Sequence, residues 1–152
     1  MSFVVRKLTP TDIPQLRELN LLFGEAFADP QTYAAEPPSD AYLGELLAEP
    51  HIVVLVGLVQ TRVAGGLVAY ELRKFERQRS EIYIYDLAVA EPFRRRGIAS
   101  ALLQHLCRIA GERGASSVFV QADYPDAPAI ALYTKFGARE EVLHFDIEPP
   151  RR

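Results

Sequence analysis

The sequence has only one cysteine, Cys107, and three histidines among its 152 residues. A single cysteine excludes an internal disulfide and suits a reducing cytoplasm. Cys107 lies in a predicted helix with no base partner evident in the sequence. We therefore expect it to be a small buried hydrophobe and not a nucleophile. The histidines have no metal-ligand spacing, so we expect no metal site; they are His51, His105 and His144.

Long apolar runs and a strong excess of one charge are also absent. No apolar stretch is long enough for a transmembrane helix, and residues 1–7 do not read as a signal peptide. The net charge of −3 gives no reason to expect nucleic-acid binding. We therefore expect a cytoplasmic protein that binds neither nucleic acid nor membrane.

The length and a hydrophobic content of 49% suit one domain with a sizeable core. We expect it to span residues 1–148, followed by a frayed tail at 149–152. Hydrophobic periodicity separates strands from helices along the chain. The order predicts an α+β sheet with helices on its faces. Strands are expected at 3–7, 51–59, 63–73, 81–90, 117–122 and 143–147, helices after Asp12, Ser39, Gly97 and Asp126, and a loop at 28–39.

Residues 94–99 read Arg-Arg-Arg-Gly-Ile-Ala, between a predicted strand and a predicted helix. A glycine-bearing turn that opens a helix presents backbone N–H groups without intrahelical partners, and the helix dipole favours anions there. Arginine side chains match phosphate geometry. Neither a P-loop nor a G-x-G-x-x-G fingerprint is present. We interpret the segment as a pyrophosphate cradle; the alternative is a solvated helix start.

A second segment, residues 126–138, predicts a short helix. Asp126 can cap it, Pro128 fits its first turn and Gly137 ends it. Ala129 and Tyr133 are four residues apart and therefore share one face. The small Ala129 side chain lets a ligand approach the backbone, and Tyr133 offers a phenol beside it.

Together the two segments resemble the GCN5-related N-acetyltransferase (GNAT) family. Arg94-x-x-Gly97-x-Ala99 resembles its Gln/Arg-x-x-Gly-x-Gly/Ala acetyl-CoA signature, and Asp126-x-x-Ala129-x-x-x-Tyr133 its second motif, with Asp126 where Asn is usual. The resemblance covers nearly the whole chain. Further stretches look like the type I aminoglycoside 3-N-acetyltransferases: 83–89, 121–124, 131–135 and 139–147.

The resemblance implies the GNAT fold, a mixed and mostly antiparallel central sheet of six to seven strands with helices on both faces. It also implies acetyl-CoA as cosubstrate. The pantetheine arm would lie along the open edge of one strand, where a bulge frees N–H groups, and one amide would meet the thioester oxygen. The cofactor-binding residues would be Leu87, Ala88, Val89, Arg94, Arg95, Arg96, Gly97, Ile98, Ala99, Ser100, Asp126, Ala129 and Tyr133.

Two residues are expected to move protons. An amine attacks a thioester only when neutral, so a base must remove its proton. Asp86 ends a tyrosine-rich strand just before the cofactor-binding residues, and we expect it to be that base; the alternative is a capping or salt-bridging acid. By family analogy Tyr133 is the general acid for the departing thiolate; the alternative is a core or helix-face tyrosine.

The acceptor site follows from charge. Aminoglycosides are polycations, so their site should be lined by acids. For any single acid a solvated surface position is the alternative, but the resemblance runs through Asp123 and Glu141. The expected substrate-binding residues are Asp29, Tyr85, Asp86, Asp123, Tyr124, Glu141 and Asp146.

The sequence thus predicts an N-acetyltransferase that moves acetyl from acetyl-CoA to the 3-amino group of an aminoglycoside by direct attack in a ternary complex. One alternative is another amine acceptor: a polyamine, a small amine or a protein amine. The other is a non-catalytic acyl-CoA-binding sensor. Late apolar residues permit a homodimer: Val142, Leu143, Phe145 and Ile147.

Overall fold

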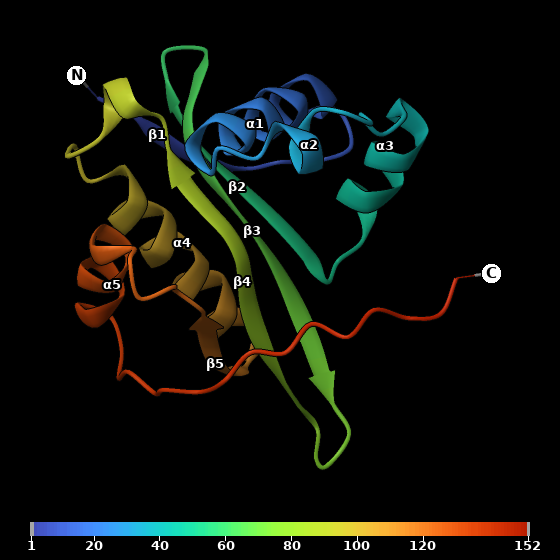
Figure 1. The fold of residues 1–152 in the computed structure, drawn as a ribbon, viewed down its shortest axis with the longest axis vertical. Helices are drawn as coiled ribbons and strands as arrows, with labels where there is room; N and C mark the ends of the chain where they lie inside the picture. Colours follow the sequence, from blue (N-terminus) through green and yellow to red (C-terminus); the bar gives the residue numbers. More distant parts are fainter. Residues whose placement is uncertain (1, 152) are drawn as a thin grey trace. The chain divides into compact units, whose positions relative to one another are not determined.

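The computed structural model describes residues 2–151. The chain divides into two compact units, Met1–Gln121 and Ala122–Arg152. Among the described residues, the first holds the whole sheet, four α-helices and one 3₁₀ turn, and the second holds one short helix (Figure 1). The expectation of one domain over residues 1–148 stays a prediction.

A five-stranded sheet forms the centre of the first unit (Figure 1). The first four strands pair antiparallel in chain order, and β5 adds to β4 in parallel. The predicted mixed, mostly antiparallel sheet is confirmed. The predicted number of six to seven strands is wrong, because residues 138–151 form no strand. The strands are β1 (Val4–Lys7), β2 (Ile52–Val59), β3 (Arg62–Lys74), β4 (Arg79–Val89) and β5 (Ala115–Val120).

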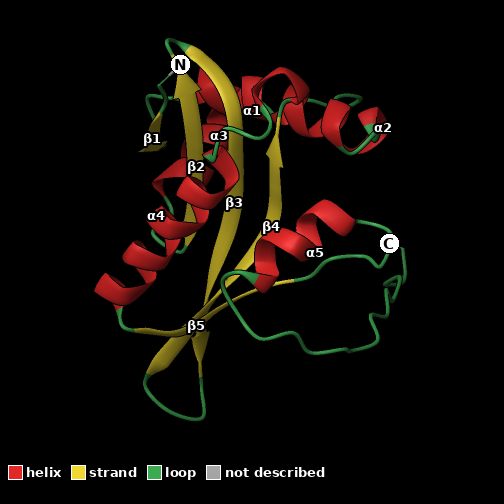
Figure 2. Ribbon diagram, turned by 90° about the vertical axis from the view of Figure 1, so that its left-hand side faces the viewer, coloured by secondary structure: helices red, strands yellow, loops and turns green. Residues whose placement is uncertain are grey.

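Helices cover both faces of this sheet, as predicted (Figures 1 and 2). Along β2, Val54 and Val56 are buried in the core that α1 covers. A Cβ at the adjacent Gly57 would instead lie 2.8 Å from Ile98 Cγ2 of α4. Because successive strand residues point to opposite faces, α1 and α4 lie on opposite sides. The helices of this unit are α1 (Ile13–Ala26), α2 (Pro30–Tyr33), α3 (Asp40–Ala48), the 3₁₀ turn η1 (Glu91–Phe93) and α4 (Ile98–Arg113).

Cys107 is exposed, so the prediction of a buried hydrophobe at this position is wrong. The buried residues Leu102, Leu106 and Ala110 recur every four positions and form the inner face of α4. Cys107 follows Leu106 by one residue, which turns it about 100° away from that face. Within residues 2–151, no cluster of His, Cys, Asp and Glu could hold a metal ion, and no helix is long and apolar enough to span a membrane.

The second unit contains α5 (Ala127–Thr134) followed by an extended segment. The predicted strand at 143–147 is wrong. Its alternation of Leu143, Phe145 and Ile147 is typical of a strand, but a strand also needs a hydrogen-bonded neighbour, and no described strand pairs with it. Its apolar side chains are exposed, Ile147 to 87%. The possible homodimer stays a prediction.

Close packing at Gly66 allows α1 to lie on the sheet. A Cβ there would lie 2.5 Å from Leu19 Cδ1 and 2.8 Å from the Leu55 carbonyl oxygen. We expect Gly66→Ala to destabilise the fold by about 1–3 kcal/mol, because the backbone oxygen cannot move aside. Urea denaturation measures the loss. The control is Gly111→Ala, a helical glycine with open space around it, which should gain about 0.5–1 kcal/mol. Equal stability of Gly66→Ala and wild type would contradict this account.

Candidate active site

A β-bulge in β4 turns Asp86 toward the face that α1 covers. Asp86 and Ile84 pair with consecutive β3 residues, Val68 and Ala69, so Tyr85 is the extra residue. In a regular strand Asp86 would share the face of the buried Ile84. The extra residue reverses the alternation of side chains, so Asp86 points to the face opposite to that of Ile84. Ala88, two positions on, packs against the α1 core, which fixes the face of Asp86.

The Tyr33 side chain of α2 reaches the Asp86 carboxylate of β4. Its hydroxyl donates a hydrogen bond to Asp86 Oδ1 at 2.8 Å. Its ring packs against Phe23 of α1 and against Phe27, which follows that helix, with ring centroids 5.9 and 5.7 Å away. Phe23 is fully buried, so the tyrosine is anchored in the core and only its hydroxyl end reaches Asp86.

Tyr33 is a site residue that the sequence reading missed. Residues 28–39 were predicted to be a loop, but they contain α2. The helix forms because the Asp29 carboxylate accepts a hydrogen bond from the Thr32 N–H at 3.1 Å and Pro30 occupies the first turn. The Asp-Pro pair was the available signal. Asp29, a predicted substrate residue, therefore serves as the cap of α2.

The environment of Asp86 makes its carboxyl easier to protonate than an exposed one. Burial raises the pKa of the Asp86 carboxyl above its ordinary value, and the bond from Tyr33 offsets only part of that rise. Burial and the Asp86 charge raise the pKa of the Tyr33 phenol, so the phenol remains a protonated donor. Among the described residues no cation pairs with Asp86. A half-buried carboxylate of this kind suits a general base.

Three tyrosines line the sheet beside Asp86. Tyr85 is 63% exposed and meets the rings of Tyr70 and Tyr83 edge-on, at 6.0 and 5.6 Å. Tyr83 stacks on Phe119 of β5 at 4.7 Å. The predicted substrate residue Tyr85 therefore lies in a row of aromatic rings next to Asp86.

The second half of β4 has an open edge. β5 pairs with β4 only as far as Ile84. On the other side of β4, the Ala90 N–H donates a hydrogen bond to the Ala64 carbonyl of β3 at 2.8 Å. Antiparallel strands alternate bonded and outward residues, so Leu87 and Val89 direct their N–H groups away from β3. The predicted bulge and free edge are both present, and an extended chain with amide groups could pair there.

The arginine segment forms a cradle at the start of α4. Arg95 and Gly97 both have positive φ, 64° and 83°. The first bond of the helix runs from the Ala101 N–H to the Gly97 carbonyl at 3.0 Å, so the N–H groups of residues 98–100 precede the ladder. No described side chain caps this end. Glycine adopts positive φ freely, whereas Arg95 does so at a cost of about 1–2 kcal/mol.

Side chains of the segment tie it to the sheet. Arg94 Nε donates to the Val89 carbonyl at 3.0 Å, which joins the cradle to the end of the open edge. The guanidinium groups of Arg62 and Arg96 lie over the Phe93 ring, 5.3 and 5.6 Å from its centroid. Phe93 is buried. The cradle is thus anchored by an aromatic ring and carries concentrated positive charge suited to phosphate.

In the second unit the predicted helix cap is confirmed. Asp126 accepts a hydrogen bond from the Ala129 N–H at 3.3 Å. Tyr133 lies one turn beyond Ala129 on α5 and is half-buried. Burial and the Asp126 charge raise the pKa of the Tyr133 phenol to about 12. Tyr133 therefore carries its proton at neutral pH, as a general acid must.

The remaining predicted substrate acids of this unit do not form one group. Tyr124 donates a hydrogen bond to Glu141. That bond, with Arg139 at 2.9 Å, lowers the pKa of the Glu141 carboxyl. Asp146 instead bonds His144 at 2.9 Å. The Asp123 side chain is exposed. The structure joins Tyr124 and Glu141 by a hydrogen bond and pairs Asp146 with His144.

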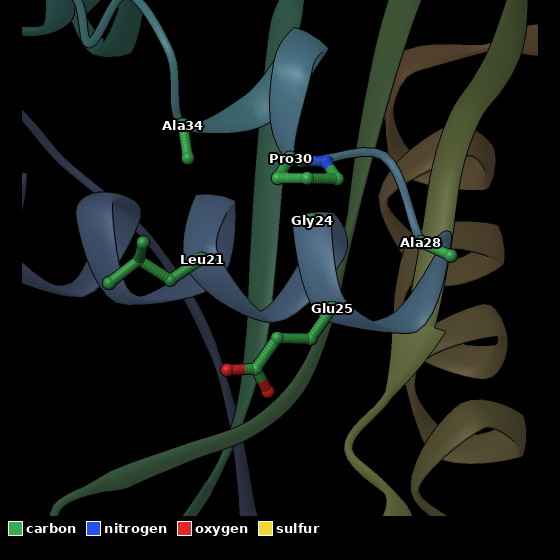
Figure 3. A pocket seen from close by; sticks show the side chains of 6 residues that line it. All are labelled: Leu21, Gly24, Glu25, Ala28, Pro30 and Ala34. Carbon is green, nitrogen blue, oxygen red and sulfur yellow. The ribbon is translucent and has the colours of Figure 1, made fainter.

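A cavity of about 330 Å³ lies between α1 and α2, lined mostly by aliphatic residues (Figure 3). Its one charged lining residue is Glu25, whose carboxylate points away from Pro30 and Ala34 in the figure. Neither Asp86 nor Tyr33 lines it. The cavity is therefore separate from the site around Asp86.

Solved aminoglycoside acetyltransferases resemble this chain over its whole length. One, from an uncultured soil metagenomic sample, is 51% identical with a TM-score of 0.96, covering 99% of this chain and 100% of that one. Another from an uncultured soil metagenomic sample, in complex with sisomicin, is 30% identical with a TM-score of 0.89, covering 97% of each chain.

A curated N-alpha-acetyltransferase of Sulfolobus acidocaldarius is 28% identical, covering 94% of this chain and 83% of that protein. The model of the acetyltransferase (GNAT) family matches residues 16–138. That span includes the bulge of β4, its open edge, the cradle at the start of α4, and α5. The chain therefore belongs to the GNAT family of acetyltransferases.

Proposed function

We propose that the protein transfers acetyl from acetyl-CoA to the 3-amino group of an aminoglycoside antibiotic by direct attack in a ternary complex. The observation that carries the proposal is the whole-length similarity to aminoglycoside acetyltransferases, one of them bound to sisomicin. The aromatic face with its half-buried Asp86 supports the same acceptor class. A carboxylate attracts an ammonium group, and aromatic faces attract cations.

Acetyl-CoA would bind along β4 and the start of α4. The N–H groups of residues 98–100, the bend at Arg95 and Gly97, and the neighbouring guanidinium groups suit a diphosphate. The outward N–H groups of Leu87 and Val89 suit the amides of the pantetheine arm. The family resemblance also implies coenzyme contacts for Asp126, Ala129 and Tyr133.

In the proposed reaction Asp86 accepts the proton of the acceptor ammonium, directly or through a water molecule. The free nitrogen lone pair attacks the thioester carbonyl carbon, so a C–N bond forms and the C–S bond breaks. A backbone N–H of Leu87 or Val89 stabilises the oxyanion. Tyr133 gives its proton to the departing thiolate. No acyl-enzyme forms in this reaction.

The acceptor would contact acids and phenols. Tyr85 and Asp86 would bind the reacting ring, and Asp29 would add negative charge at the start of α2. Tyr124 and Glu141 would act as one group because they already share a hydrogen bond. Asp123 and Asp146 stay proposals from the family resemblance.

A second acceptor class has specific support. The chain is 28% identical to a curated N-alpha-acetyltransferase over 94% of its length, and a protein amine would need the same base and the same coenzyme site. Polyamine acetylation and non-catalytic acyl-CoA sensing are the further alternatives. The identity of the acceptor separates all of them.

An amine panel tests the acceptor. Thiol release from acetyl-CoA is followed with sisomicin, gentamicin, spermidine and an N-terminal peptide. We expect turnover with the two aminoglycosides only, because a polycationic ring system fits an acid-lined aromatic face. NMR of the product locates the acetyl group, expected at the 3-amino nitrogen. Turnover of the peptide alone would support the protein-amine alternative, and coenzyme binding without any turnover would support the sensor.

Two substitutions of similar size test the proton carriers. We expect Asp86→Asn to lower turnover at least about 100-fold, because the amide cannot accept the proton. Tyr133→Phe keeps the ring and removes the acid, and we expect a loss of roughly 10- to 100-fold. Steady-state kinetics give turnover, and calorimetry with acetyl-CoA should show nearly wild-type affinity for Asp86→Asn. Wild-type turnover in either variant would remove that residue from the mechanism.

Substitution at Gly97 tests the cradle. A side chain there meets open space but must accept a positive φ, and it would cover the N–H groups that follow. We expect Gly97→Trp to weaken acetyl-CoA binding at least about tenfold, since one lost charge-assisted hydrogen bond costs about 1.5–3 kcal/mol. The matched control is Gly114→Trp, at the other end of α4 with φ 71° and open space. Calorimetry showing equal affinities for both variants would contradict the placement.

A further inference from the structure

We propose that Tyr33 is a positioning residue for Asp86: its hydroxyl fixes Oδ1 of the carboxylate and leaves Oδ2 directed to the acceptor amine. The inference rests on the proposed function and adds a residue and an element, α2, that the family motifs do not contain. It predicts that the Tyr33 hydroxyl sets the pH range in which Asp86 acts as a base.

The geometry of the Tyr33 hydroxyl gives the carboxylate one orientation. The 2.8 Å bond ends on Oδ1 alone. The tyrosine ring cannot easily follow a rotating carboxylate, because Phe23 and Phe27 pack on it. The Gly24 backbone also packs closely against Tyr33, because a Cβ added at Gly24 would lie only 3.3 Å from Tyr33 Cβ. A side chain locked by packing in this way positions its partner with little loss of entropy.

A chain reversal brings α2 to this place. Ala28 has φ 50°, in the left-handed region, and the next N–H, of Asp29, bonds back to the Gly24 carbonyl at 3.0 Å. A non-glycine residue occupies that region at a cost that surrounding structure must offset. The hydrogen bonds and aromatic contacts of α2 supply that offset, so the position of Tyr33 is determined by the fold and not by Asp86 alone.

The groups that face Asp86 include one hydrogen-bond donor and several neutral phenols. Tyr33 of α2, Tyr70 of β3 and Tyr83 of β4 all feel the Asp86 charge. Asp29, Tyr42 and Tyr85 face those phenols in turn. No cation belongs to this group within the described residues. The Tyr33 bond is therefore the contact that favours ionised Asp86, and burial opposes it.

Loss of the Tyr33 bond should change the pKa of Asp86 in one direction. The Tyr33 bond lowers the pKa of Asp86, so its removal should raise that pKa further. A general base works only when deprotonated. The rate of the variant should therefore fall at low pH and approach the wild-type rate at high pH, where Asp86 is ionised in both proteins. A purely structural role for Tyr33 would lower the rate equally at every pH.

Tyr33→Phe tests the inference. We expect the acid limb of the profile of kcat/KM for the aminoglycoside to move up by about one pH unit, as loss of one hydrogen bond to a charged group implies. Below both pKa values this is a loss of about tenfold. The affinity for acetyl-CoA should not change. The matched control is Tyr42→Phe, at an exposed tyrosine of α3 outside the aromatic row; its acid limb should stay in place. An unmoved limb in Tyr33→Phe would overturn the proposal.

A second variant covers the case in which Tyr33→Phe folds poorly. Replacing Tyr33 by 3-fluorotyrosine keeps the ring and the hydroxyl but makes the phenol a stronger donor. The acid limb should then move down, opposite to the change in Tyr33→Phe. Movement in the same direction for both would contradict the hydrogen-bond account.

A measurement without substrate separates this inference from the proposed function. Carbon NMR of the labelled Asp86 carboxyl, assigned with Asp86→Asn, gives its pKa in the wild type and in Tyr33→Phe. A higher pKa in the variant together with no aminoglycoside turnover would retain the Tyr33 contact and refute the acceptor. Aminoglycoside turnover with equal pKa values in the two proteins would refute the role of Tyr33 and retain the acceptor.

Discussion

The bulge at Tyr85 is the constraint on which the rest of the site depends. One extra residue in β4 moves the Asp86 side chain from the α4 face to the α1 face. It also fixes which amides of the following residues turn away from β3. Without it, a carboxylate would enter the leucine-rich layer under α4, where an isolated charge costs several kcal/mol. The single insertion therefore sets both the face of Asp86 and the amides that point to the open edge.

In the proposed reaction, one short stretch of strand would serve two ligands. Asp86 faces the aromatic surface, and Leu87 and Val89 face the open edge. Neighbouring residues lie about 3.3 Å apart along the strand. An acceptor on the face and a thioester on the edge would approach each other at this stretch. Arg94 closes its far end through the Val89 carbonyl, so the strand and the cradle form a continuous surface.

The sequence predicted those parts of the fold that local chemistry determines. The dense β-branched run of β2, the Ser39 and Asp126 caps, and the glycine at the start of α4 all occur where expected. The strand at 143–147 failed because alternation indicates extended backbone but supplies no partner. Tyr33 was missed because its role depends on contact with Asp86, 53 positions away. Neither the reversal at Ala28 nor that contact leaves a periodic pattern in the sequence.

The outward position of Cys107 has a practical consequence. It is the single thiol in the sequence, and it is exposed on α4. A maleimide dye could be attached there without entering the core. The arginine cradle lies at the start of the same helix, so, if acetyl-CoA binds there as proposed, the emission of the dye could follow that binding without a new reporter residue.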